Sequence, residues 1–150
     1  MLEEKKQNEK TLEASRNKIY LDTFVFMDML SGQKDLMDKA KKYIMQPSMV
    51  SSIIFAELVF HMIRNGIPKS KKDEILFYVR SLENLEILDV TDEIAELAGR
   101  LRGRYWKRLE KKLTYFDSIH LATAVINNVK KFVTGDKDFR GIEEIAIELY

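Results

Sequence analysis

The chain has 150 residues, a formal net charge of +1, 45% hydrophobic and 33% charged residues, and no cysteine. This composition is typical of one globular domain, and the lack of cysteine excludes disulfides, thiolate nucleophiles and cysteine-based zinc sites and favours a cytoplasmic protein. No apolar run approaches the roughly 20 residues that cross a membrane, and the near-neutral charge gives no overall attraction for nucleic acid.

The first half of the chain begins with a charged segment and continues with strands and helices. Residues 1–17 mix both charge signs and offer little to bury, so we expect a flexible, disordered or loosely helical extension before a domain of residues 18–150. A short apolar run that ends at Asp22 predicts a buried strand. The expected elements are a strand at 19–21, helices at 24–30 and 35–45, a strand at 49–50, and a helix capped by Ser51 or Ser52 that runs to residue 65.

The second half continues the alternation. Thr91 and Thr114 are predicted N-caps, because a threonine hydroxyl can accept a hydrogen bond from a free backbone N–H. Strands separated by helices need crossover connections, which predicts an α/β fold with a mainly parallel sheet and helices on both faces. The expected elements are a helix at 70–82, a strand at 85–88, a long helix after Thr91, a helix from Thr114 to residue 127, a strand at 132–134, a turn at 136–139 and a strand at 145–149.

Four acidic residues occupy positions that such a sheet would bring together. Asp22 directly follows a predicted strand, Asp136 follows another, and Glu57 and Asp117 lie early in predicted helices. Sites in parallel sheets form beyond the carboxyl ends of the strands, where the strand order reverses. Clustered carboxylates repel one another unless a cation lies between them, and hard divalent ions prefer oxygen ligands. The pattern therefore predicts a Mg²⁺ or Mn²⁺ site.

Each acid also has a structural interpretation. Asp22 could end a strand, Glu57 could be a solvated helix residue, and Asp117 has capping-box spacing. Asp136 and Asp138 could both be turn residues, and the spacing leaves open which of them is the fourth ligand, with Asp136 preferred because it lies nearer the strand end. The occurrence of all these acids together favours a metal site over a set of separate structural roles.

Two threonines flank these acids. The hydroxyls of Thr23 and Thr134 are suited to orienting a carboxylate or a metal-bound water, although both could equally be local caps.

These motifs resemble those of a known family. Residues 18–150 are similar to a PIN domain, close to the VapC-type ribonuclease toxins and their archaeal relatives. The resemblance implies a three-layer α/β/α fold with a five-stranded sheet, Mg²⁺- or Mn²⁺-dependent endoribonuclease activity, an acidic core of Asp22, Glu57 and Asp117, and Asp136 as fourth member. One departure is Phe24, where the family often has a small or polar residue. The motifs are LDT at 21–23, FAEL at 55–58, DSIHLATA at 117–124 and TGDKDF at 134–139.

A basic segment at residues 99–112 is a candidate surface for holding RNA near the metal. Tyr105 or Trp106 could stack a base. The alternative is a solvated helix face with both aromatic residues packed inward, Trp106 in particular. The predicted RNA-binding residues are Arg100, Arg102, Arg104, Lys107 and Arg108.

The mechanism and the partners have alternatives. Held metal ions would activate water and leave 5′-phosphate and 3′-hydroxyl ends. His61 and His120 each share a helix face with an acid, which would also suit a di-iron site or metal-free acid–base catalysis; otherwise they pack or support the site. A PIN-fold binding module without catalysis is a further possibility. The resemblance implies an RNA substrate, a small antitoxin partner and a homodimer, and leaves open a toxin or an RNA-processing nuclease.

Overall fold

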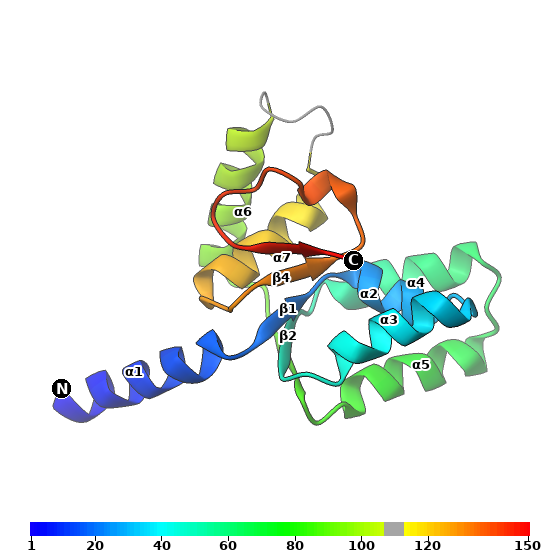
Figure 1. Ribbon diagram of the computed structural model, residues 1–150, viewed down its shortest axis with the longest axis horizontal. Coiled ribbons are helices and arrows are strands. Elements are labelled where there is room, and N and C mark those ends of the chain that lie inside the picture. Colours follow the sequence, from blue (N-terminus) through cyan, green and yellow to red (C-terminus); the bar gives the residue numbers. More distant parts are fainter. Residues whose placement is uncertain (107–112) are drawn as a thin grey trace.

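The computed structural model describes residues 1–106 and 113–150. It contains one five-stranded sheet in the order β3-β2-β1-β4-β5, with every neighbouring pair parallel. Helices cover both faces of this sheet, so the expected α/β class is confirmed (Figure 1). The strands are β1 (Ile19–Leu21), β2 (Ser48–Ser51), β3 (Leu85–Leu88), β4 (Phe132–Thr134) and β5 (Ile147–Leu149).

The helices lie close to their expected positions, with one wrong cap. The helix after β2 begins only at residue 54, because Ser51 remains paired in the sheet opposite Leu88. Its N-cap is Ile53, so the prediction of Ser51 or Ser52 is wrong. The helices are α1 (Leu2–Arg16), α2 (Thr23–Met29), α3 (Lys34–Ile44), α4 (Ile54–Arg64), α5 (Lys69–Ser81), α6 (Asp92–Tyr105), α7 (Tyr115–Ile126) and the short 3₁₀ helix η1 (Lys137–Phe139).

Alternation along the strands divides the core into two layers. Tyr20 and Phe132 belong to the core on the side of α6 and α7, and their rings stack with centroids 5.2 Å apart. Ile19, Leu21 and Val133 belong to the core on the side of α2 to α5. Both sides of the sheet are therefore closed to water, and each fully buried large apolar side chain contributes about 1.5–3 kcal/mol.

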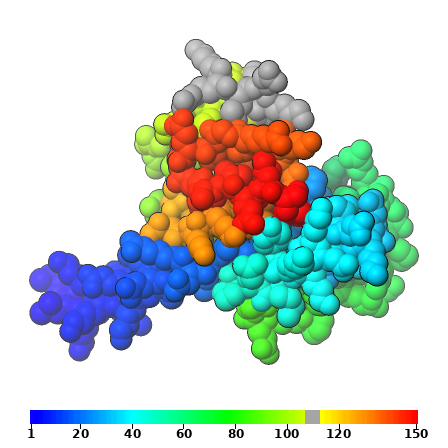
Figure 2. Space-filling view, in the orientation of Figure 1, coloured from blue at the N-terminus to red at the C-terminus, as the bar shows by residue number. Residues whose placement is uncertain are grey.

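Helix α1 projects from the rest of the molecule (Figures 1 and 2). Its only buried residue is Ser15, and helices of this length are marginal in water without packing. Deleting residues 1–14 is therefore expected to change the free energy of unfolding by less than about 1 kcal/mol, as measured by urea denaturation. A loss of several kcal/mol would show that α1 is an integral part of the domain. That the segment is flexible stays a prediction, which limited proteolysis would test.

Candidate active site

The site lies where the strand order reverses, between β1 and β4. Asp22 follows β1 and is the N-cap of α2, where its Oδ1 accepts a hydrogen bond from the Thr23 backbone N–H at 2.9 Å. Thr134 ends β4, and its hydroxyl donates to Asp22 Oδ2 at 2.7 Å. The two strand ends thus fix both oxygens of one carboxylate.

Asp22 is only 5% exposed. The pKa of its carboxyl is raised from 3.8 to about 6, chiefly by burial. His120 and the Thr134 hydrogen bond lower the pKa, and the negative charges of Glu57 and Asp117 add to the rise. A buried carboxylate near other acids is costly in water-free surroundings. A cation in the adjacent space would remove that cost.

Glu57, in the first turn of α4, is held through one oxygen. The Thr23 hydroxyl donates to its Oε2, and His120 Nε2 lies 2.5 Å from the same atom. Within the part of the chain that the structure describes, Oε1 of Glu57 makes no hydrogen bond. One oxygen is anchored to protein and the other is left for the cavity that Glu57 lines.

His120 connects this acid to the core. It is fully buried on α7, and its Nδ1 lies 2.7 Å from the hydroxyl of Tyr20, which also accepts the Ser51 N–H at 2.8 Å. Burial lowers the pKa of His120, but the hydrogen bond to Glu57 and the charges of the nearby acids outweigh it and raise the pKa overall. The ring therefore joins Glu57 to Tyr20 in the core.

Asp117 has the capping role that its spacing predicted, and its role as a metal ligand stays a prediction. Its backbone N–H donates to Thr114 Oγ1 at 3.1 Å and its Oδ2 accepts from the Thr114 N–H at 2.9 Å, which completes a capping box. Its Oδ1 makes no hydrogen bond to the described residues, and the side chain lines the same cavity as Glu57. As with Glu57, one oxygen is anchored and one is not.

Asp136 and Asp138 lie just after β4, Asp136 as the N-cap of η1 and Asp138 within it. The Asp136 N–H donates to Thr134 Oγ1 and the Asp138 N–H donates to Asp136 Oδ1, each at 2.9 Å. Both side chains line the cavity, so either can supply the fourth carboxylate. Gly135 is required between them and β4, because a Cβ there would come within 2.5 Å of the Phe24 ring.

The cavity itself has a volume of about 640 Å³. Asp22 is buried and is not among its described lining residues. The wall combines carboxylates, which could share a cation, with exposed aromatic rings, on which flat groups could stack. Its lining residues include Glu57, Phe60, His61, Tyr115, Phe116, Asp117, Asp136 and Asp138.

The donor chemistry of this cavity suits a hard divalent cation, since oxygen atoms predominate. As the side chains stand, however, no group of three His, Asp or Glu residues within 1–106 and 113–150 is close enough to share one metal ion. The reason lies in the anchors described above: Glu57 is held on His120 and Asp117 is held in its capping box. These side chains are of the type that binds such a cation, but they would have to move closer together to share one.

The predicted RNA-binding residues divide into three cases. Arg100 pairs with Glu96 at 2.6 Å, and Arg104 pairs with Glu144 at 2.7 Å. Arg102 instead stacks on aromatic rings. Lys107 and Arg108 lie outside the described residues.

The aromatic residues of the same segment point in different directions. Tyr105 is buried, as the inward-packing alternative predicted. Trp106 is 42% exposed, so its assignment to the core is wrong.

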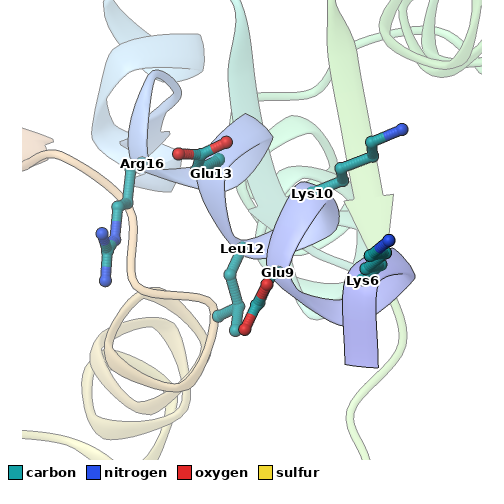
Figure 3. Close-up of a pocket in the computed structure, with 6 residues that line it drawn as sticks. All are labelled: Lys6, Glu9, Lys10, Leu12, Glu13 and Arg16. Carbon is teal, nitrogen blue, oxygen red and sulfur yellow. The ribbon is translucent and has the colours of Figure 1, made fainter. Parts of the chain in front are cut away.

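The hollow along α1 differs in chemistry from the acidic cavity. This hollow runs along α1, where side chains of both charge signs spread around the helix in several directions (Figure 3). No helix among the described residues is long and apolar enough to cross a membrane. The hollow on α1 is lined by Lys6, Glu9, Lys10, Leu12, Glu13 and Arg16.

Sequence reasoning missed the part that Tyr20 plays. Tyr20 lies two residues before Asp22 in a buried strand, and its hydroxyl is the only polar atom of that side chain. A tyrosine within an otherwise aliphatic strand indicates that its hydroxyl has a buried partner. That signal does not identify the partner.

Comparisons with solved structures show the same fold in several bacterial proteins. A toxin–antitoxin complex from Klebsiella pneumoniae is 22% identical over 87% of this chain and 96% of that chain, with a TM-score of 0.63. VapBC2 from Rickettsia felis, bound to a DNA fragment from its promoter, is 21% identical over 87% and 98%, with a TM-score of 0.66. A VapC toxin from Mycobacterium tuberculosis, described as cleaving the sarcin-ricin loop, is 18% identical over 86% and 99%, with a TM-score of 0.66.

A search of curated protein sequences gave no match. The family model of the PIN domain, in contrast, matches residues 19–145, which is most of the chain and includes Asp22 and the acids that line the cavity. The match begins at β1 and leaves out α1. On this match and on the five-stranded parallel sheet, the chain belongs to the PIN domain family.

Proposed function

We propose that this protein is a divalent-metal-dependent endoribonuclease and the toxin of a toxin–antitoxin pair. The observation that carries the proposal is the gathering of Glu57, Asp117, Asp136 and Asp138 on one cavity, next to the buried Asp22. Membership of the PIN family supports nuclease activity. The relative described as cleaving the sarcin-ricin loop supports RNA as the substrate.

Asp22, Glu57, Asp117 and Asp136 would hold Mg²⁺ or Mn²⁺, with Asp138 as the substitute for Asp136. Such an ion activates a water molecule and offsets charge on the phosphate that is attacked. The protein supplies the positioning: Thr134 orients Asp22, and Thr23 together with His120 fixes one oxygen of Glu57.

The exposed aromatic side chains of the cavity wall have a separate part. Tyr115 is 63% exposed and Phe116 is 40% exposed at the start of α7. Flat rings beside a phosphate site favour a strand whose bases are unstacked, because such bases can pack on the rings. This supports single-stranded RNA as the substrate.

Cleavage of a labelled single-stranded RNA with added Mn²⁺ or Mg²⁺ tests the proposal. We expect cleavage by the wild type, its loss in EDTA, and products with 5′-phosphate and 3′-hydroxyl ends. Asp117→Asn should lower the rate at least about 100-fold, since even the outer partners of metal ligands are typically worth 10- to 100-fold. Asp73→Asn, an exposed acid on α5, is the matched control and should cleave like the wild type.

Two results would contradict the proposal. Equal cleavage by the wild type and Asp117→Asn would assign the activity to a contaminant. Cleavage that persists in EDTA and leaves 2′,3′-cyclic phosphate ends would assign it to histidine acid–base catalysis instead.

The partners follow from the same comparisons. Several of the compared structures are described as toxin–antitoxin complexes, which supports a small antitoxin as a partner of this chain; that the chain forms a homodimer stays a prediction. Phe60, on the cavity wall, and Ile63, one turn further along α4, are 66% and 58% exposed, which is apolar surface that a partner could cover. In the cleavage assay, a bound antitoxin should suppress the activity.

A further inference from the structure

A smaller hollow lies between the last turn of α6 and the start of α7, and we call it the α6–α7 shelf. It has a volume of about 220 Å³ and is lined by Gly99, Arg102, Gly103, Trp106 and Tyr115. Its floor is open, because a Cβ added at either glycine would meet nothing within 4 Å. Two helical glycines one turn apart thus leave a flat space beside exposed aromatic rings.

The guanidinium of Arg102 is fixed within this shelf. Its Cζ lies 4.1 Å from the centre of the Tyr115 ring and 4.9 Å from the centre of the Trp106 ring. Its Nε donates to the carbonyl of Leu113 at 3.1 Å, and among the described residues its two terminal amino groups have no hydrogen-bond acceptor. Arg100 and Arg104, on the same helix, have carboxylate partners, so Arg102 differs from both.

The shelf adjoins the acidic cavity through one residue. Tyr115 lines both hollows, and Asp117 follows it within the same turn of α7. A strand whose phosphate lies beside the carboxylates would therefore place a neighbouring nucleotide at the shelf. The shelf offers what a base requires, namely flat rings, a cation and room for one planar ring system.

We propose that the α6–α7 shelf binds one unstacked base of the RNA strand whose phosphate lies in the acidic cavity, an inference that rests on the proposed function. The base stacks on Trp106 and Tyr115 above the glycine floor. Arg102 donates from its terminal amino groups to that base or to the adjoining phosphate. The substrate is then a single-stranded segment, because a base within a duplex cannot reach such a shelf.

The fluorescence of Trp106 reports on this site alone, because it is the single tryptophan of the chain. In EDTA, a short single-stranded RNA oligonucleotide should quench the emission as it binds. An oligonucleotide of the same length with abasic positions should bind through its phosphates and leave the emission nearly unchanged. Equal quenching by both, or binding detected by anisotropy without quenching, would overturn the proposal.

A side chain that fills the shelf should weaken RNA binding without destabilising the fold, so that the two effects can be told apart. Gly103→Leu should raise thermal stability, because a better helix former replaces glycine, and should weaken RNA binding about 10-fold or more. Arg102→Ala should also weaken binding, whereas Lys39→Ala, at an exposed position of α3, makes the same charge change away from the shelf and should have little effect. If Gly103→Leu and Arg102→Ala bound RNA as tightly as the wild type, the proposal that the shelf binds a base would be wrong.

The cleavage assay distinguishes this failure from failure of the proposed function. If the wild type cleaves RNA with Mn²⁺ and Asp117→Asn does not, while both shelf variants bind and cleave normally, the shelf proposal fails alone. If the wild type neither binds nor cleaves single-stranded RNA, both proposals fail together.

Discussion

Replacing Asp22 with asparagine is expected to raise the free energy of unfolding of the metal-free protein by about 2 kcal/mol at neutral pH and to abolish RNA cleavage. The pKa of this carboxyl is raised from 3.8 to about 6 in the folded protein, chiefly by burial. Keeping the group ionised in the folded state therefore costs about 3 kcal/mol at neutral pH. Asparagine removes that cost.

The replacement also weakens one hydrogen bond, and this loss reduces the net gain in the free energy of unfolding. Asparagine can still accept from the Thr23 N–H, and asparagine is as good an N-cap as aspartate. The Thr134 hydroxyl, which donates to Asp22 Oδ2, loses its charged acceptor, at a cost of about 1 kcal/mol. The gain therefore exceeds the loss.

The raised pKa of Asp22 also determines how the stability of the wild type changes with pH. Between about pH 4 and pH 6 the folded protein keeps a proton on Asp22 that the unfolded chain has released. The unfolded state thus binds fewer protons, so the stability of the wild type falls as the pH rises through this range. The variant has no such group, and the stability difference between the two proteins should be small near pH 4 and largest above pH 6.

Urea denaturation in EDTA at several pH values measures this difference, and repeating it with Mg²⁺ links it to function. Magnesium should stabilise the wild type by mass action and leave Asp22→Asn nearly unchanged. If Asp22→Asn were less stable than the wild type at pH 7 in EDTA, the ionised Asp22 carboxylate would not destabilise the metal-free protein, and this prediction would be wrong. Equal stabilisation of both proteins by Mg²⁺ would remove Asp22 from the metal site.

The placement of the acids could be predicted from the sequence because it depends on strand ends. Asp22 and Asp136 each follow a short apolar run, and parallel pairing alone puts the ends of β1 and β4 at one edge. The capping box at Thr114 and Asp117 is also local, since its two residues are three apart. Features set by a few neighbouring residues were thus accessible.

Features that depend on distant partners were not accessible. Tyr20 and His120 are 100 residues apart, and Glu57 and His120 are 63 apart, so no local pattern could join them. Ser51 shows the converse, because a hydroxyl residue before a helix favours an N-cap, yet its pairing with Leu88 in the sheet decides its position. Tertiary pairing overrode the local preference there.

His120→Leu is expected to destabilise the protein by about 2–4 kcal/mol, because it leaves buried polar groups without partners. The hydroxyl of Tyr20 and the Oε2 atom of Glu57 both face His120 nitrogens, and leucine offers neither a donor nor an acceptor. Leucine fills much of the same volume, so a cavity accounts for little of the loss. Urea denaturation in EDTA measures the change.

A second readout separates positioning from packing. If His120 holds Oε2 of Glu57 so that Oε1 remains for a cation, the Mg²⁺ concentration for half-maximal cleavage should rise about 10- to 100-fold in His120→Leu. Leu121→Ala, at the next position of α7 and fully buried, is the matched control. It should lose a comparable 2–5 kcal/mol of stability and keep the Mg²⁺ dependence of the wild type. If His120→Leu also kept the wild-type Mg²⁺ dependence, the His120 ring would contribute only to the packing of the core. Glu57 would then bind a metal without being positioned by His120.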